Sequence, residues 1–148
     1  MTRKPIVAAL CAAALLTFSA RLARAAQTPT APKQLVLDFF RVVFEAEDAE
    51  AARGYLHEGY IQHNPLVATG RKGFIDYFKT KWKKPKPVEP RLRQPPESVV
   101  AEGDLVSVMW KVSRPEPSDG SKSYDSFWFD LFRVKDGLIV EHWDNALK

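Results

Sequence analysis

Cysteine is almost absent from this chain of 148 residues, in which Cys11 is the single example. Long hydrophobic runs are also missing. The apolar run from Ile6 to Phe18 has about a dozen residues, whereas a membrane-spanning helix needs roughly 20. The sequence therefore predicts neither a disulfide-stapled scaffold nor a protein that spans a membrane.

Several catalytic motifs are missing as well. The chain has no Gly-x-Ser-x-Gly segment, which a hydrolase nucleophile would need, and no His-x-x-x-His pair of the kind that ligates zinc. It has only seven glycines and no glycine-rich loop for phosphate. We therefore expect no nucleophilic hydrolysis, no cofactor and no metal ion.

What is present at the N-terminus is typical of a secretory signal. Arg3 and Lys4 precede the apolar run, and Ala23-Arg24-Ala25 follows it as a cleavage site between small residues. We expect cleavage after Ala25. This divides the chain into a signal peptide (1–25), a flexible leader (26–31) and one domain (32–148), and it predicts a periplasmic or secreted protein that leaves the membrane after cleavage.

Removal of the signal changes the charge balance. The whole chain has 22 basic and 18 acidic residues, and four of the basic residues lie in the signal, so 22 − 4 = 18 basic residues face 18 acidic ones. A formally neutral, exported domain lacks the basic surface that nucleic-acid binding requires. We therefore expect no nucleic-acid partner.

Apolar residues recur at helical spacing in the first part of the domain. The pattern predicts a helix over residues 33–45, a short second helix over 48–56 and a third helix over 72–83. Residues 60–64 form a short extended segment between the second and third helices, and Pro65 ends it.

After a proline-rich linker the periodicity changes to that of strands. We expect strands at 98–101, 105–114, 124–134 and 138–144, with a long polar loop at 115–123. Helices followed by antiparallel strands indicate an α+β fold in which the helices cover one face of a curved sheet.

The turn of the last hairpin decides which side chains share a face. A two-residue turn at 136–137 would place Asp130 opposite Trp143, whereas a three-residue loop would place Asp130 opposite His142. We favour the three-residue loop because it makes Arg133 and Glu141 diagonal neighbours of opposite charge.

This register predicts two different faces. One face carries Trp128, Asp130, Phe132, Val140, His142 and Asp144. The other carries Phe127, Phe129, Leu131, Arg133, Ile139, Glu141 and Trp143. Because helices cover only one side of the sheet, we expect a second copy of the chain to cover the other side in a homodimer.

Four segments of the chain resemble SnoaL-like proteins of the nuclear transport factor 2 superfamily, in the branch labelled as predicted aldol-condensation enzymes. They are Tyr60–Pro65, Gly70–Phe74, Ala101–Val106 and Asp130–Asp144. The resemblance implies a cone-shaped curved antiparallel sheet with three N-terminal helices, an apolar pocket and a dimer.

The ionisable residues of these segments suggest acid–base chemistry on a small apolar carbonyl compound, as a lyase or isomerase of the aldol or cyclase type. By analogy with ketosteroid isomerase, a relative by fold, Asp130 would take a proton from the carbon next to the carbonyl, and His63 or His142 would polarise the carbonyl or return the proton. The expected substrate-binding residues are Tyr60, Gln62, Asn64, Trp110, Trp128 and Asp144. Two alternatives stay open: a periplasmic module that binds an apolar ligand without catalysis, and a structural dimer whose pocket is filled by its own side chains.

Overall fold

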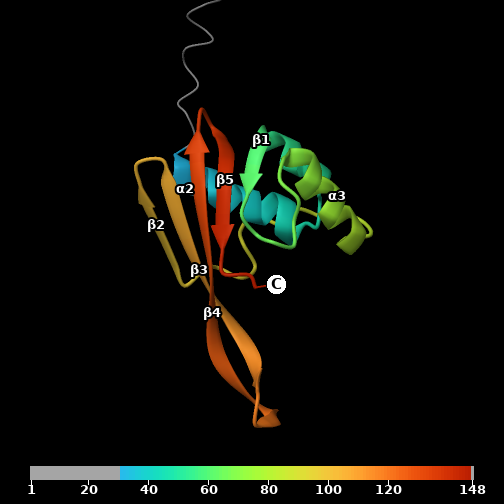
Figure 1. Cartoon of the computed structure of the whole chain (residues 1–148), viewed down its shortest axis with the longest axis vertical. Coiled ribbons are helices and arrows are strands. Elements are labelled where there is room, and N and C mark those ends of the chain that lie inside the picture. The colour runs from blue at the N-terminus through green and yellow to red at the C-terminus, as the bar shows by residue number, and fades with distance from the viewer. Residues whose placement is uncertain (1–30, 148) are drawn as a thin grey trace, which may run out of the picture.

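A computed structural model describes residues 31–147, so the predicted signal and almost all of the leader lie outside the described residues. Figure 1 shows the helices on one side of a five-stranded sheet and a two-stranded arm that extends away from the body of the molecule. The α+β fold and the curved sheet are as predicted. Within the described residues, no helix is both long and apolar enough to cross a lipid bilayer.

The helical part is less regular than predicted. The first helix, α2 (Pro32–Phe39), continues directly into the π-helical segment η1 (Phe40–Glu45), and the third is α3 (Arg71–Lys81). The middle segment, η2 (Glu50–Gly54), is only a 3-10 turn. Three N-terminal helices are therefore not what residues 31–147 contain: this part of the chain has two α-helices, and strand β1 lies between them in sequence.

The sheet has the strand order β1-β5-β4-β3-β2. The antiparallel part comprises β2 (Ser98–Glu102), β3 (Leu105–Glu116), β4 (Asp119–Lys135) and β5 (Leu138–Asp144). These bounds are close to the predicted ones except in β4, which begins at Asp119 instead of at residue 124. The extended segment before Pro65 belongs to β1 (Leu56–Gln62), which pairs with β5 in parallel. This pairing places β1, which comes early in the domain, beside β5, its last strand.

The predicted loop at 115–123 is wrong. Strands β3 and β4 stay paired almost to their ends, with Pro115 opposite Ser123 and Glu116 opposite Asp119, and they form the arm in Figure 1. Because the arm is a ribbon exposed on both faces, its residues lack the apolar alternation that marks a half-buried strand. Polar composition alone therefore suggested a loop.

The register of the last hairpin also differs from the prediction. Asp136 and Gly137, with φ of 51° and 75°, form a two-residue turn that pairs Lys135 with Leu138. A bulge between Arg133 and Val134 then shifts the pairing by one residue. A two-residue turn matches the right-handed twist of the strands, and the bulge inserts one extra residue into β5.

Beyond the bulge, Asp130 lies opposite Asp144 and Phe132 lies opposite His142. The predicted pairing of Asp130 with His142 is therefore wrong, yet the two residues still share a face because the turn and the bulge together shift the register by two. Only the residues near the turn change sides: Ile139, which was expected on the outer face, is fully buried in the core in place of Val140.

The core lies between the helices and the inner face of the sheet. Phe39 of α2, Phe74 of α3 and Phe132 of β4 are almost fully buried, and the Phe39 ring lies 5.8 Å and 6.0 Å from the other two rings. Aromatic side chains bury large areas and meet edge to face, so few residues are needed to join the three elements. The site described next occupies the open end of this layer.

Candidate active site

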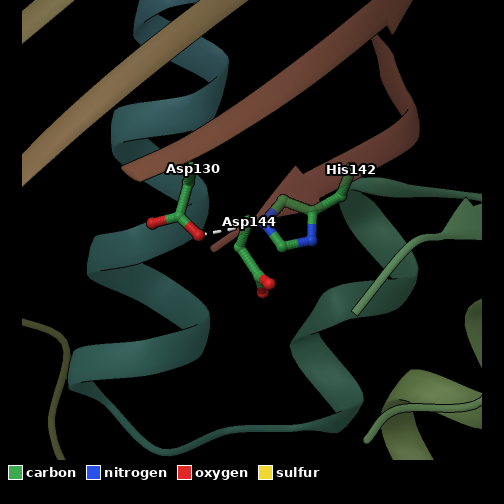
Figure 2. Close-up of side chains that lie close together, drawn as sticks. All are labelled: Asp130, His142 and Asp144. Atoms are coloured by element: carbon green, nitrogen blue, oxygen red, sulfur yellow. Dashed lines mark hydrogen bonds and ion pairs between the residues drawn. The ribbon is translucent and has the colours of Figure 1, made fainter. Parts of the chain in front are cut away.

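A cavity of about 440 Å³ opens between the helices and the inner face of the sheet. Nine of the 19 residues that line it are phenylalanine, tyrosine or tryptophan, and Phe40 and Phe44 reach it from the π-helical segment η1. Single π-helical turns inside helices are frequent at functional sites. Polar side chains of the wall come from several elements, and Figure 2 shows three of them, Asp130 on β4 and His142 and Asp144 on β5, which lie close together.

Asp130 is held by three nitrogen atoms at the inner end of this wall. Its Oδ2 accepts a hydrogen bond from Trp110 Nε1 at 2.8 Å, and its Oδ1 accepts one from Trp128 Nε1 at 3.1 Å and lies 2.9 Å from His142 Nε2. Strand alternation places Trp128 and Asp130 on one face of β4, and Trp110 lies directly opposite Trp128 on β3. A buried carboxylate surrounded by donors is well defined in position.

The hydrogen bonds of His142 locate one of its protons. His142 Nδ1 lies 2.8 Å from Gln62 Oε1, and this same oxygen accepts the backbone N–H of Asn64 at 3.0 Å. Because a backbone N–H can only donate, the Gln62 atom is an acceptor, and His142 Nδ1 must carry a hydrogen. One further proton then lies between His142 Nε2 and Asp130 Oδ1, since two bare acceptors would repel each other.

Tyr60 supplies a hydroxyl group at the same end of the cavity. Its oxygen accepts a hydrogen bond from Gln62 Nε2 at 3.1 Å, which leaves its own hydrogen to donate. Burial, and then the negative charges of Asp130 and Asp144, raise the pKa of Tyr60 far above its usual range. Tyr60 therefore remains a hydrogen-bond donor.

Asp144 is fixed by two other contacts. Asn64 Nδ2 donates to Asp144 Oδ2 at 2.6 Å, and the backbone N–H of Ala146 donates to Asp144 Oδ1 at 3.0 Å. In Figure 2 the Asp144 carboxylate points away from the hydrogen bond that joins Asp130 to His142. Each oxygen of Asp144 thus has acceptor capacity left for a ligand.

Asp130, His142 and Asp144 also bring three potential metal-ligand atoms within 4.8 Å of one another. Two carboxylates and an imidazole are a chemically reasonable set for a divalent cation. However, both ring nitrogens of His142 already have partners, Gln62 and Asp130, so His142 could ligate a cation only by giving up one of them. The arrangement resembles a carboxylate positioned by donors more than an open coordination site.

His63 is the one predicted catalytic residue that the structure does not bring to the cavity. Tyr60 and Gln62 face inward on β1, so His63, one residue further along, faces outward by strand alternation. Its Nε2 lies 2.9 Å from Glu141 Oε1, and its ring stacks on Trp143 at 4.9 Å. The other eight predicted site residues all line the cavity.

Sequence reasoning missed two polar residues of the wall, Glu45 and Gln94. Glu45 ends the π-helical segment, and its carboxylate accepts the backbone N–H groups of Arg93 and Gln94. A π-helical turn shifts side chains away from regular helical spacing, and the segment around Gln94 has no periodicity. Neither position therefore gave a signal in the sequence.

Comparison with known proteins agrees with this geometry. The family model for the SnoaL-like domain matches residues 36–142. TsrD from Streptomyces laurentii has 24% identity and a TM-score of 0.55, with 80% of this chain and 90% of that chain covered. IdmH from Streptomyces antibioticus, a candidate polyketide cyclase, has 21% identity and a TM-score of 0.53, with 77% and 90% covered.

A candidate polyketide cyclase from Acidithiobacillus ferrooxidans is similar in the same way, with 19% identity, a TM-score of 0.54, and 80% of this chain and 90% of that chain covered. No curated protein matches the chain. At these identities the solved structures establish the fold alone. The family model, in contrast, covers most of the chain, so the chain belongs to the SnoaL-like family.

Proposed function

We propose that this protein is a cofactor-independent acid–base enzyme, a lyase or isomerase of the aldol or cyclase type, that acts on an apolar carbonyl compound in the cavity. The observation that carries the proposal is the pair of Asp130 and His142, joined at 2.9 Å and almost fully buried at one end of an aromatic cavity. An interior pair of this kind can hold and transfer a proton without competition from bulk water.

Asp130 Oδ2 is the atom that takes the proton. Oδ1 is occupied by Trp128 and His142, whereas Oδ2 accepts a single hydrogen bond, from Trp110. A carboxylate oxygen has two lone pairs, so Oδ2 keeps one of them for a substrate C–H. The proton shared with His142 holds the Asp130 carboxyl group in one orientation during the transfer.

The reaction begins when the C–H bond next to the substrate carbonyl breaks and its proton moves to Asp130 Oδ2. The electron pair of that bond moves to the carbonyl oxygen and forms an enolate. The Tyr60 hydroxyl group, kept protonated by its surroundings, donates a hydrogen bond to the enolate oxygen. The enolate carbon then attacks a second carbonyl: a C–C bond forms, the π electrons of that carbonyl move to its oxygen, and this oxygen takes the proton from Asp130 Oδ2. In an isomerisation the enolate is conjugated, and Asp130 Oδ2 returns the proton to another carbon of the conjugated system.

One experiment tests the first step directly. The purified protein is incubated in D2O with a panel of cyclic and aromatic ketones, and exchange of the α-hydrogen for deuterium is followed by NMR. We expect the protein to accelerate exchange and Asp130→Asn to lose about 10²- to 10⁴-fold of that acceleration, the range typical of general bases. Glu141→Gln, a matched substitution on the other face of the sheet, should keep it.

The second candidate function is ligand binding without catalysis, and the same hydrogen bonds support it. Asp130 Oδ1 contacts Trp128 and His142, and both ring nitrogens of His142 have protein partners. Hydrogen bonds of this kind also occur in networks that are purely structural. A binding module would retain an apolar ligand through purification and would show no exchange above background. Equal exchange by wild type and Asp130→Asn would favour this function.

We also propose that the protein acts after export. The support is the sequence of residues 1–25, with its basic start, its short apolar run and its cleavage site. Mass spectrometry of protein recovered from the periplasm or medium should give a chain that begins at Ala26. A chain that retains Met1 and stays in the cytosol would contradict the proposal.

A further inference from the structure

Two carboxylates face each other across the inner side of the last hairpin. Asp130 on β4 lies directly opposite Asp144 on β5, and both line the cavity. Like charges at directly opposed positions of a sheet destabilise it unless something compensates them. Repulsion between these two carboxylates would therefore destabilise this part of the sheet.

The charge of this wall does not depend on where the shared proton lies. If His142 holds it, the charges of Asp130, His142 and Asp144 are −1, +1 and −1. If Asp130 holds it, they are 0, 0 and −1. In both cases the three groups together carry one net negative charge, located at the Asp144 side.

No cation of the described residues compensates that charge. The ion pairs within residues 31–147 do not include Asp144, and the cavity wall contains no lysine or arginine. The remaining acid of the wall, Glu45, has its own counter-ion in Arg93, with Nε 3.7 Å from Oε2. Asp144 is thus the carboxylate of the cavity that a ligand would have to cover.

A ligand that fills the cavity removes water from Asp144. Covering a carboxylate with a neutral group is unfavourable, and covering it with an anion is worse, whereas an ammonium group replaces the lost hydration with a charge-assisted hydrogen bond. The indole rings of Trp110 and Trp128 line the same wall and can contact a cation through their faces.

We propose that the ligands of this cavity are monocationic, with a protonated amine on an aromatic-sized apolar body, and that Asp144 is the counter-ion of the amine. Hydrogen bonds from Asn64 and from the backbone of Ala146 hold the two Asp144 oxygens in place. The inference rests on the proposed function only in taking the cavity as the substrate site. It narrows the substrate proposed there to an amino ketone, whose apolar body carries the carbonyl at Asp130 and the amine at Asp144.

The test uses three probes of one shape and different charge: 1-naphthylmethylamine, 1-naphthylmethanol and 1-naphthoate. Binding to the purified protein at pH 7 is measured by calorimetry. We expect the amine to bind about tenfold or more tighter than the alcohol, the gain typical of a hydrogen bond to a charged group, and the carboxylate to bind weakest. Asp144→Asn should bring amine and alcohol to about equal affinity, and Glu141→Gln should leave their ratio unchanged.

Equal binding of amine and alcohol by wild type would overturn the inference, as would an amine preference that survives in Asp144→Asn. Absence of binding by all three probes would also overturn it, because a cavity of this size and lining should accept a bicyclic aromatic. The proposed function fails separately: if no ketone exchanges its α-hydrogen but the amine preference persists, the catalytic proposal is lost and the charge preference stands.

Discussion

The two faces of the same sheet each carry a pair formed by a histidine and a carboxylate. On the inner face, His142 Nε2 lies 2.9 Å from Asp130 Oδ1, and on the outer face His63 Nε2 lies 2.9 Å from Glu141 Oε1. The distances are equal, but the side chains of the inner pair are each 9% exposed, whereas those of the outer pair are 41% and 20% exposed.

The partners of each pair differ as much as the burial. The indole groups that hold Asp130 are neutral, and within residues 31–147 no lysine or arginine lies in the cavity wall beside it. Glu141 instead joins a chain of surface charges: Arg133 Nε donates to it at 3.1 Å, and Arg133 also pairs with Asp104 at 3.0 Å. The contact between histidine and carboxylate is therefore the same on both faces, and what distinguishes the inner pair is the exclusion of water and the neutral donors around it.

The largest expected effect that separates the faces is on catalysis. We expect His142→Gln to slow α-hydrogen exchange by about 10²-fold or more, since Asp130 would lose the proton that orients it. His63→Gln should leave the rate unchanged, because its ring lies outside the cavity and stacks on Trp143. NMR measurements in D2O give both exchange rates. Slow exchange by His63→Gln together with an unchanged rate for His142→Gln would contradict this prediction.

The free energy of unfolding should also differ between variants of the two faces, but by less than the exchange rate does. His142→Ala leaves Asp130 as a buried carboxyl group without its hydrogen-bonded histidine, and removal of one partner of a buried pair costs about 3 kcal/mol in other proteins. His63→Ala removes a half-exposed pair, which is typically worth less than about 1 kcal/mol. Urea unfolding gives both free energies of unfolding, and a difference near zero would show that the inner pair is not a tight unit.

The outer face should also differ from the inner face in association. Phe127, Phe129 and Val100 are 43%, 47% and 62% exposed, a set of apolar side chains on a sheet face that no helix covers. We propose that a second copy of the chain covers them. Phe129→Lys should then convert a dimer into a monomer in sedimentation at micromolar concentration, with the exchange rate as a control for folding. A wild-type monomer would refute this.

Periodicity in the sequence predicted most of the fold, because buried strands alternate and buried helical stripes repeat. It failed where these constraints are absent. The arm formed by β3 and β4 has two exposed faces, and the bulge near Val134 depends on how the turn twists the strands, which one sequence does not reveal. The face of each residue beyond the bulge was nevertheless correct, since a shift of two positions preserves alternation.

The site followed the same rule. Asp130, His142 and the indole residues lie on strands whose inner face could be predicted, and they meet as expected. His63 was misplaced because alternation was not applied to the extended segment at 60–64; alternation from Tyr60 through Gln62 directs His63 outward. Glu45 and Gln94 could not be predicted, because their positions depend on a π-helical turn and an irregular segment.

The smallest expected effect is the pH dependence of the stability that Glu141 contributes on the outer face. The hydrogen bond to His63, and after it the hydrogen bond and charge of Arg133, hold the pKa of Glu141 below its ordinary value of 4.5, although partial desolvation opposes them. A carboxyl group with a depressed pKa in the folded state stabilises the protein fully above its unfolded pKa, and this contribution is lost as pH falls through the folded pKa.

The difference in stability between wild type and Glu141→Gln should therefore be constant near neutral pH and shrink as pH falls below about 4.5. It should also shrink in high salt, because the charges around Glu141 are exposed to solvent and screened. Thermal unfolding from pH 7 to pH 3, at low and high salt, measures both trends. If this difference in the free energy of unfolding grew as the pH fell, ionised Glu141 would not be stabilised by His63 and Arg133. The outer pair would then not be the stabilising, solvent-exposed pair with which the inner pair is compared.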